Sequence, residues 1–339
     1  MTTVFEKEIR SQGALIRARA ERGDEQAARA VAAWGDLSYC LVAARGSSDN
    51  AAVFFQYLAG RETGLLVALA APSLFEHDAP RVGGAGVLAI SQSGRSPGIG
   101  DVLAHARRQG RPSVVITNDV RSPLVEVADV VIDLAAGPER ALASTKTFST
   151  TWHALAQLTS ALRGAPLSGL DVLGDVVDAA VQDLLAREVP DPLLEVRTGL
   201  TVVGRGVGYA AAREIAIKVR EVAGVRAEAF SVADFLHGPI GADGEGAALL
   251  LVVTDEVSDA LAAEVLEGSR ATGLTTTVLA PASRATSAGD ARVTVDDAPN
   301  WTLGLVDVVF GQVLALRLGE RRGRPIDTAP GLAKVTLSA

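Results

Sequence analysis

The chain has 339 residues, of which 48% are hydrophobic and 21% are charged, and it is long enough to bury one large or two medium-sized cores. Its net charge of −8 comes without a basic cluster, which argues against nucleic acid as a partner. The N-terminal segment is charged and lacks a signal-peptide core, and no apolar run approaches membrane-spanning length. We therefore expect a cytoplasmic protein with no membrane partner. The single cysteine, Cys40, cannot form an intrachain disulfide, and its apolar surroundings predict a small buried side chain rather than a nucleophile.

The first half of the chain alternates short apolar runs with helical stretches. Residues 4–34 are predicted to be helical, with a break at Gly23. The strand candidates that follow are 39–44, 65–69, 87–90, 113–116 and 130–134. The helices expected among and after them are 50–58, 98–109 and 144–162. Strands that alternate with helices predict right-handed crossovers and a parallel sheet.

The second half repeats this plan after a predicted boundary at 163–169 and a helix at 173–187. Its strand candidates are 200–203, 227–230, 247–253, 275–279 and 292–295. Its further helices are 209–222, 258–271 and 301–318. The segment 40–46 aligns with 200–206, and both copies lead into helices rich in alanine. The sequence therefore predicts two copies of one α/β unit.

A polar turn follows the apolar run 87–90. Ser91, Gln92, Ser93 and Ser96 supply hydroxyl and amide donors, and Pro97 opens the next helical segment. The start of a helix has unpaired backbone N–H groups and the positive end of a dipole, so this turn is suited to bind a phosphate. The alternative is that Ser93 or Ser96 simply caps the helix.

A glycine-rich turn at 204–210 invites comparison with a dinucleotide fingerprint. Tyr209 stands where the third glycine belongs, however, and the next strand carries Glu228 inside it rather than at its end. A Walker lysine motif is also missing, and the four histidines lack the spacing of metal ligands. We expect neither a cofactor nor a metal.

Three charged residues share one face of the predicted helix 209–222. Glu214, Lys218 and Glu221 are spaced i, i+4 and i+7. The alternative is a solvated row of ion pairs. His237 lies at a loop edge where Gly-Pro ends a short helix, and Lys334 lies near the C-terminus, where a lysine is normally solvated.

Together these motifs resemble the sugar isomerase (SIS) family, above all the isomerase half of glucosamine-6-phosphate synthase and the stand-alone amino-sugar-phosphate deaminases. Seven matching pieces run in family order along the chain. They are the segments 46–48, 91–94, 136–148, 214–221, 226–230, 237–239 and 332–334.

The resemblance implies two doubly wound SIS domains, each a five-stranded parallel sheet between helices. The expected division is an N-terminal helical segment at 1–34 and domains at 35–165 and 196–320, with a connecting helix at 166–195 and a tail at 321–339 that completes the active site. In the family, Ser91, Gln92, Ser93 and Ser96 match the phosphate cradle, with Ser48 beside it.

The resemblance also implies the roles of the reacting residues. Glu221 matches the base that moves a proton between C1 and C2, and Ser144 matches a residue that holds the sugar near these carbons. His237 matches a histidine that assists ring opening from the neighbouring subunit, which implies a homodimer. Lys334 matches the lysine that meets the open-chain carbonyl. Lys218 is counted with the substrate-binding residues.

The expected activity is deamination and isomerisation of an amino-sugar 6-phosphate. The chain begins without the N-terminal cysteine of the synthase, so glutamine-dependent synthesis is not expected. Gly98 stands where the deaminases usually have aspartate, which leaves the subgroup open. The alternatives are a dehydratase that acts on N-acetylglucosamine 6-phosphate, a fructosamine-6-phosphate deglycase, and a sugar-phosphate sensor without catalysis. The retained Glu221, His237 and Lys334 argue against the sensor.

Overall fold

The computed structural model describes residues 2–76, 80–242, 244–284, 289–328 and 334. Over these residues the chain forms two five-stranded parallel sheets flanked by helices, and it divides into two compact units. The sheet A unit takes in the described parts of 12–139, 146–174 and 333–339, and the sheet B unit takes in those of 1–11, 140–145 and 175–332. The predicted α/β class with two five-stranded parallel sheets is confirmed.

Sheet A has the strand order β2-β1-β3-β4-β5. Its strands are β1 (Tyr39–Ala43), β2 (Val67–Leu69), β3 (Ala85–Ile90), β4 (Ser113–Thr117) and β5 (Val130–Asp133). All neighbours pair in parallel, and Val42 of β1 stands beside Leu69 on one side and Leu88 on the other. The strands β3 and β4 are buried along their whole length, which is typical of a parallel sheet covered on both faces.

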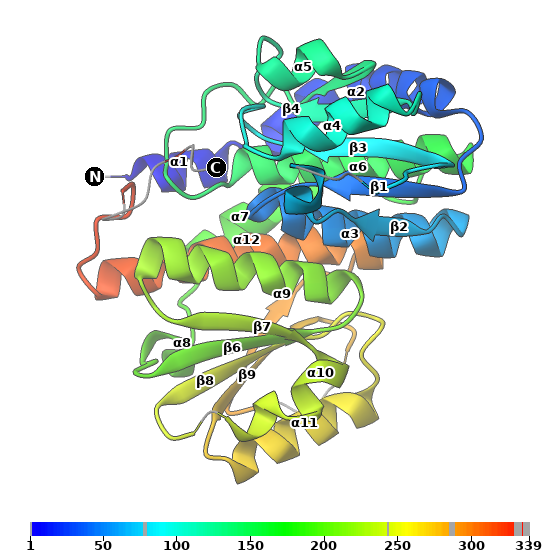
Figure 1. Cartoon of the computed structure of the whole chain (residues 1–339). Helices are drawn as coiled ribbons and strands as arrows, with labels where there is room; N and C mark the ends of the chain where they lie inside the picture. Colours follow the sequence, from blue (N-terminus) through cyan, green and yellow to red (C-terminus); the bar gives the residue numbers. More distant parts are fainter. Residues whose placement is uncertain (1, 77–79, 243, 285–288, 329–333, 335–339) are drawn as a thin grey trace. The chain divides into compact units, whose positions relative to one another are not determined.

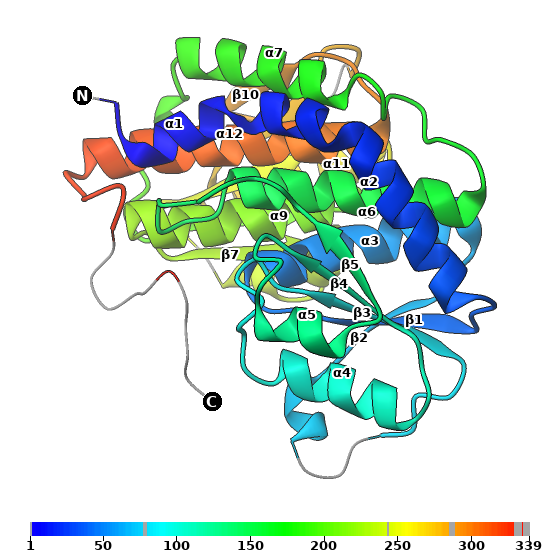
Figure 2. The same cartoon turned by 90° about the horizontal axis from the view of Figure 1, so that it is seen from above.

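Helices cover both faces of sheet A, as Figures 1 and 2 show. One face carries α2 (Gln12–Trp34), α3 (Ser47–Thr63) and α6 (Lys146–Arg163), and the other carries α4 (Ile99–Arg108) and α5 (Pro123–Val127). A short 3-10 segment, η1 (Pro72–Phe75), follows β2. Four apolar residues of α4 are buried and pack in one cluster with side chains of sheet A, namely Ile99, Val102, Leu103 and Ala106.

The predicted helix break at Gly23 is wrong. The chain breaks at Ser11 instead, after α1 (Val4–Arg10), and α2 continues through Gly23. Gly23 is buried because the carboxamide of Gln157 packs directly against its Cα, where any larger residue would collide with it. The glycine therefore serves close packing between α2 and α6 rather than a turn.

Sheet B has the strand order β10-β9-β8-β6-β7. Its strands are β6 (Gly199–Gly204), β7 (Ala227–Ser231), β8 (Ala247–Val252), β9 (Thr275–Pro281) and β10 (Ala291–Val295). In both sheets the first strand in chain order lies between the second and the third, and the fourth and fifth strands follow the third. The predicted internal repeat is therefore present in the topology.

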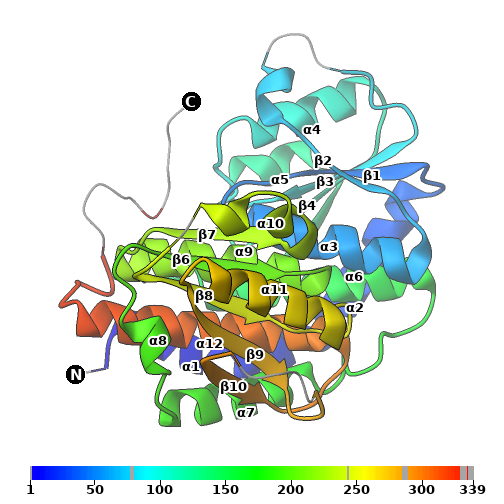
Figure 3. The same cartoon turned by 90° about the horizontal axis from the view of Figure 1, so that it is seen from below.

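The helices of the sheet B unit also form two layers (Figures 1 and 3). The helices α9 (Val207–Lys218) and α12 (Asn300–Arg321) pack together on one face, and α10 (Val232–Leu236) and α11 (Asp259–Ala271) lie on the other. The remaining elements are α7 (Leu173–Ala186), α8 (Asp191–Leu194), η2 (Val219–Ala223) and η3 (Pro239–Gly241).

The helix α12 is long and apolar enough to span a membrane by its 22 residues and its mean hydropathy of 1.5. The expectation that no apolar run approaches this length is therefore wrong for α12. The structure explains the composition differently, because 94% of the apolar stretch is buried inside the protein. The helix packs along α9 and forms a core element of the sheet B unit.

Candidate functional site

The predicted phosphate turn lies at the point where the connections of sheet A change direction. The strands β1 and β3 are neighbours, but the chain leaves β1 towards β2 and leaves β3 towards β4. Ligands of open α/β sheets bind outside the carboxyl ends of the strands at such a point. Ser48 follows β1 and Ser91 follows β3, so the fold brings these two serines to the same edge of the sheet.

Hydrogen bonds within the turn fix its shape. The hydroxyls of Ser91 and Ser96 lie 2.9 Å apart, and the backbone N–H of Gly94 donates to Ser91 Oγ at 3.1 Å. The backbone N–H of Arg95 donates to Ser93 Oγ at 3.3 Å. Gly94 has a φ of +61°, a left-handed conformation that favours glycine. The turn therefore gathers the predicted serines around one small loop.

Neither Ser93 nor Ser96 caps the following helix. The helix α4 begins at Ile99, and its N-cap is Gly98, which has a φ of +75° and no side-chain cap. The capping alternative is therefore wrong. The start of α4 lies two residues later than Pro97 because Gly98 provides the left-handed turn into the helix.

Because of the internal repeat, the start of α3 in the sheet A unit can be compared with the start of α9 in the sheet B unit. Gly46 precedes α3 and Gly206 precedes α9, and both have a φ of +58°. At Gly206 the carboxylate of Glu256 packs against the glycine Cα, beside the start of α9. At Gly46 no described atom lies within 4 Å of the place where a side chain would begin. The sheet B unit therefore fills this position with its own anionic group, and the sheet A unit leaves it open.

The charged residues at the end of α9 form a buried cluster. Lys218 Nζ lies 2.8 Å from Glu221 Oε2 and 3.3 Å from Glu214 Oε1. The side chains of Lys218 and Glu214 are fully buried, and that of Glu221 is 25% exposed. The predicted sharing of one helix face is confirmed, and the alternative of a solvated ion-pair row is wrong.

Glu221 lies on a turn that the sequence does not predict. The helix α9 ends at Lys218 and continues as the π-helical turn η2, which Gly224 ends with a φ of +64°. Such wide turns are common at functional sites because they redirect a side chain without ending the helix. The result is that Glu221 alone of the three charged side chains reaches the solvent, while Lys218 holds its carboxylate from inside.

His237 is the C-cap residue of α10 and directly follows its last residue, Leu236. Its ring Nδ1 lies 2.7 Å from the carbonyl oxygen of Ala233. A carbonyl can only accept, so Nδ1 donates to it, and in the neutral form of the ring Nε2 is then the acceptor. The residue is exposed, as its predicted place at a loop edge implies.

Lys334 is held by the carboxylate of Glu139, which is not among the predicted site residues. Its Nζ lies 2.8 Å from Oε2 of Glu139, whose side chain is fully buried, while the side chain of Lys334 is 26% exposed. The two residues are 195 positions apart in the chain. The expectation of a solvated terminal lysine is therefore wrong.

The remaining predicted site residues fall in two groups. The sheet A unit contains Ser48, the turn 91–96 and Lys334, and the sheet B unit contains Ser144, Lys218, Glu221 and His237. Ser144 lies in the loop before α6 rather than on the helix, because α6 begins at Lys146. Lys218 is buried and bound to two carboxylates, so its predicted contact with a substrate stays a prediction.

Cys40 lies in the core and is not part of the candidate site. Cys40 is fully buried on β1, and burial raises the pKa of its thiol well above the usual range. This confirms its expected place in the core. In the described part of the chain, no three His, Cys, Asp or Glu side chains are grouped as metal ligands.

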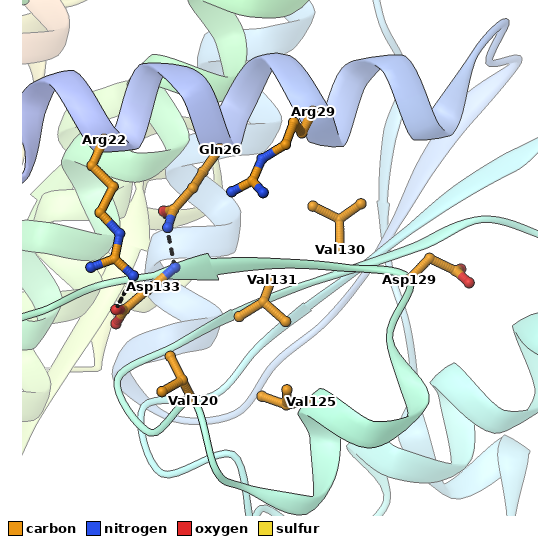
Figure 4. A pocket seen from close by; sticks show the side chains of 9 residues that line it. All are labelled: Arg22, Gln26, Arg29, Val120, Val125, Asp129, Val130, Val131 and Asp133. Atoms are coloured by element: carbon orange, nitrogen blue, oxygen red, sulfur yellow. Dashed lines mark hydrogen bonds and ion pairs between the residues drawn. The ribbon is translucent and has the colours of Figure 1, made fainter.

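A cavity of about 480 Å³ lies between α2, α5 and the edge strand β5 (Figure 4). Arg22 forms a 2.9 Å ion pair with Asp133 at one end, and Gln26 accepts the backbone N–H of Asp133 at 3.1 Å. Four valines, Arg29 and Asp129 form the rest of its lining. None of the predicted site residues lines this cavity. The side chain of Gln26 instead occupies a pairing position on the free edge of β5, which protects that edge.

Comparison with known proteins identifies the family. The sequence profile of the SIS domain matches residues 40–161. A solved structure from Silicibacter pomeroyi DSS-3, described as a candidate phosphosugar isomerase, is 30% identical and superposes with a TM-score of 0.84. That match covers 96% of this chain and 99% of the other. The chain belongs to the SIS domain family.

Two further proteins are similar to this chain, one in sequence and one in fold. A glutamine–fructose-6-phosphate aminotransferase from Aeropyrum pernix is 30% identical over 328 residues, which cover 91% of this chain and 52% of the relative. The SIS chain thus spans about half the length of the curated relatives it matches. A glucosamine-6-phosphate deaminase from Thermotoga maritima shares the fold, with a TM-score of 0.77 over 98% of this chain and 99% of the other, at 20% identity.

Proposed function

We propose that this SIS protein is an amino-sugar 6-phosphate deaminase/isomerase that converts glucosamine 6-phosphate and water to fructose 6-phosphate and ammonia. The observation that carries the proposal is the contrast between Gly46 and Gly206. The open position at Gly46 corresponds to the one that the Glu256 carboxylate fills beside the start of α9. An anion therefore suits the open position, and a sugar phosphate supplies one.

The phosphate would bind at the turn after β3. Ser91, Ser93 and Ser96 bring hydroxyl groups to this turn, Gln92 brings a side-chain amide, and Ser48 lies at the neighbouring strand end. These contacts with the phosphate group would lie far from C1 and C2 of the sugar. Their binding energy would orient the open-chain sugar for proton transfer rather than take part in the reaction itself.

Glu221 would act as the base that moves the proton. In the open-chain aldose it would take the proton from C2 and deliver it to C1, while the C1 oxygen gains a proton to become a hydroxyl and the C2 amine loses one to become an imine. Water would add to this imine carbon, ammonia would leave, and the ketose would form. The 2.8 Å bond from Lys218 Nζ supports this role because it fixes the carboxylate while 25% of the Glu221 side chain remains exposed.

His237, Lys334 and Ser144 would assist the same reaction. His237 would help open the sugar ring, since its exposed Nε2 can accept a proton. Lys334 would meet the carbonyl of the open-chain sugar, and Ser144 would hold the sugar near the reacting carbons. These roles follow the resemblance to the family.

A panel of sugar 6-phosphates tests the proposal. Purified protein is incubated with glucosamine, N-acetylglucosamine and fructosamine 6-phosphates, and the products are identified by mass spectrometry. The proposal expects fructose 6-phosphate and ammonia from the first substrate only. An unsaturated product from the N-acetyl sugar would show a dehydratase instead, a freed amine from the fructosamine would show a deglycase, and binding without turnover would show a sensor.

We further propose that the protein acts in the cytoplasm as a homodimer in which His237 serves the partner's site. His237 is exposed, and only its Nδ1 is used in the contact with the Ala233 carbonyl. This leaves Nε2 on the other side of the ring for a partner, which supports the arrangement. Mixing a His237→Ala protein with a Glu221→Gln protein tests it after the subunits are exchanged. Mixed dimers should regain activity at one site, and a mixture as inactive as its two components would contradict the exchange.

A further inference from the structure

The carboxylate of Glu139 is buried and fully engaged. Its Oε1 accepts the backbone N–H of Thr147 at 3.1 Å, and its Oε2 accepts the hydroxyl of Thr147 at 2.6 Å and the ammonium of Lys334 at 2.8 Å. Glu139 lies in the extended loop before α6, and Thr147 lies in the first turn of that helix. The whole arrangement belongs to the sheet A unit.

The start of α6 explains why a carboxylate is stable at this buried position. The first backbone N–H groups of a helix have no partner within the helix, and the helix dipole favours a negative charge there. Glu139 uses one of these N–H groups and the Thr147 hydroxyl, so the protein fixes both carboxylate oxygens before Lys334 is added. Lys334, unlike the two donors of Thr147, is not part of α6, so it can leave the carboxylate without disturbing that helix.

We propose that Glu139 positions Lys334 and carries its proton during attack on a sugar carbonyl, an inference that rests on the proposed role of Lys334. An ammonium is not a nucleophile, so Lys334 must lose a proton before its nitrogen can form a bond to carbon. Glu139 Oε2 lies at hydrogen-bond distance from that proton. No other residue is needed to accept it.

The steps balance with Glu139 as the sole proton carrier. Glu139 takes a proton from the Lys334 ammonium and becomes a neutral acid. The amine attacks the carbonyl carbon, and the C–O double bond becomes a hydroxyl as the nitrogen proton moves to oxygen. Glu139 then returns its proton to the hydroxyl, which leaves as water. The products are a protonated imine between Lys334 and the sugar, one water molecule and the original carboxylate.

Trapping of this imine tests the inference. Fructose 6-phosphate and cyanoborohydride are added to the full chain over a series of pH values, and labelling of Lys334 is followed by mass spectrometry. Glu139→Gln keeps the size of the side chain but cannot take up the proton. It should slow labelling by about 100-fold near neutral pH, and the rate should recover at high pH, where hydroxide can take the proton in place of the carboxylate.

Three further variants make the result specific. Glu139→Asp keeps a carboxylate but places it one methylene group farther from Lys334, and it should label at an intermediate rate. This variant tests the inference even if the Glu139→Gln protein does not fold. Glu6→Gln removes a different, exposed ion pair, the one that joins Glu6 to Arg10 at 2.6 Å, and should label like the wild type. Lys334→Arg should not label.

Two outcomes would overturn the inference. One is a folded Glu139→Gln protein that labels at the wild-type rate with the wild-type pH profile. The other is a wild type that releases ammonia from glucosamine 6-phosphate but never labels, which would remove the imine and leave the deamination standing. A wild type that labels as expected but releases no ammonia would support the inference and contradict the proposed function.

Discussion

Lys218 Nζ lies 2.8 Å from Glu221 Oε2, and this bond joins a fully buried cation to a partly exposed carboxylate. Glu214, also fully buried, lies 3.3 Å from the same nitrogen. Buried ion pairs rarely add to stability, because removing two charges from water costs about as much as their attraction returns. A cluster of this kind is better explained by what it positions, and Glu221 is the only member that reaches the solvent.

Replacement of Lys218 by methionine should damage both folding and activity. The substitution leaves two carboxylates at the end of α9 without their common cation, which should lower the free energy of unfolding by about 3–5 kcal/mol. Chemical denaturation measures this loss. Lys7→Met removes an exposed lysine of α1 and should change neither property. A Lys218→Met protein as stable as that control would contradict the structural account of the cluster.

The serines of the turn after β3 should contribute to affinity rather than to the chemical step. A hydrogen bond to a charged group is worth about 1.5–3 kcal/mol, so Ser93→Ala or Ser96→Ala should raise KM for a sugar phosphate by about 10-fold or more. The turnover number should change little. Steady-state kinetics separate the two quantities, with Ser73→Ala, an exposed serine of η1, as the control. A loss confined to kcat would place these serines elsewhere in the mechanism.

The two glycines of the repeat should respond differently to alanine. At both positions the backbone lies in a region that only glycine adopts readily, with φ +58° and ψ −132° or −125°, so alanine should cost about 1–3 kcal/mol of stability. Gly206→Ala must in addition displace the Glu256 carboxylate, so it should lower the melting temperature further than Gly46→Ala does. Gly46→Ala should instead weaken binding of inorganic phosphate, measured by calorimetry. Equal melting temperatures and unchanged phosphate binding would contradict the comparison between the two units.

Asp307 should make the protein less stable as the pH rises. This residue of α12 is fully buried, and burial raises the pKa of its carboxyl well above the usual value. Between the unfolded and folded pKa values the folded state holds a proton that the unfolded state lacks, so stability falls as the pH rises through that range. Asp307→Asn removes the titration and should raise the melting temperature at pH 7, and this gain should shrink below about pH 4.

The control for this prediction is Asp36→Asn, which replaces an exposed aspartate between α2 and β1. Differential scanning fluorimetry over a range of pH values compares both variants with the wild type. A gain from Asp307→Asn that is the same at every pH would show a packing effect rather than a titration.

Much of the fold could be predicted from the sequence, because its strands are parallel and the central strands of both sheets are buried. Such strands appear as short apolar runs between helices, and each of the ten expected runs coincides with a strand to within two residues at either end. The wrong prediction of a helix break at Gly23 shows where prediction from the sequence fails. Gly23 looks like a break in the sequence, and only its contact with Gln157, 134 positions away, explains why the helix continues.

The site was predictable in its residue types and less so in its contacts. The spacing of Glu214 and Lys218 indicates a shared helix face, but it cannot tell a buried cluster from a solvated one. The pair of Lys334 with Glu139 joins distant segments, and the only signal for it in the sequence is that both residues lie in motifs shared with the family. The contact of the Glu256 carboxylate with Gly206 joins residues 50 positions apart, and no motif in the sequence links them.

The most direct test of the proposed function is ammonia release from glucosamine 6-phosphate by the wild type and by Glu221→Gln. Glutamine keeps the shape of the side chain but cannot accept the C2 proton, so the variant should lose about 100- to 10,000-fold in kcat while it still binds the sugar phosphate. The account predicts that the wild type releases one ammonia for each fructose 6-phosphate formed. Equal release by the two proteins, or none by the wild type, would contradict it.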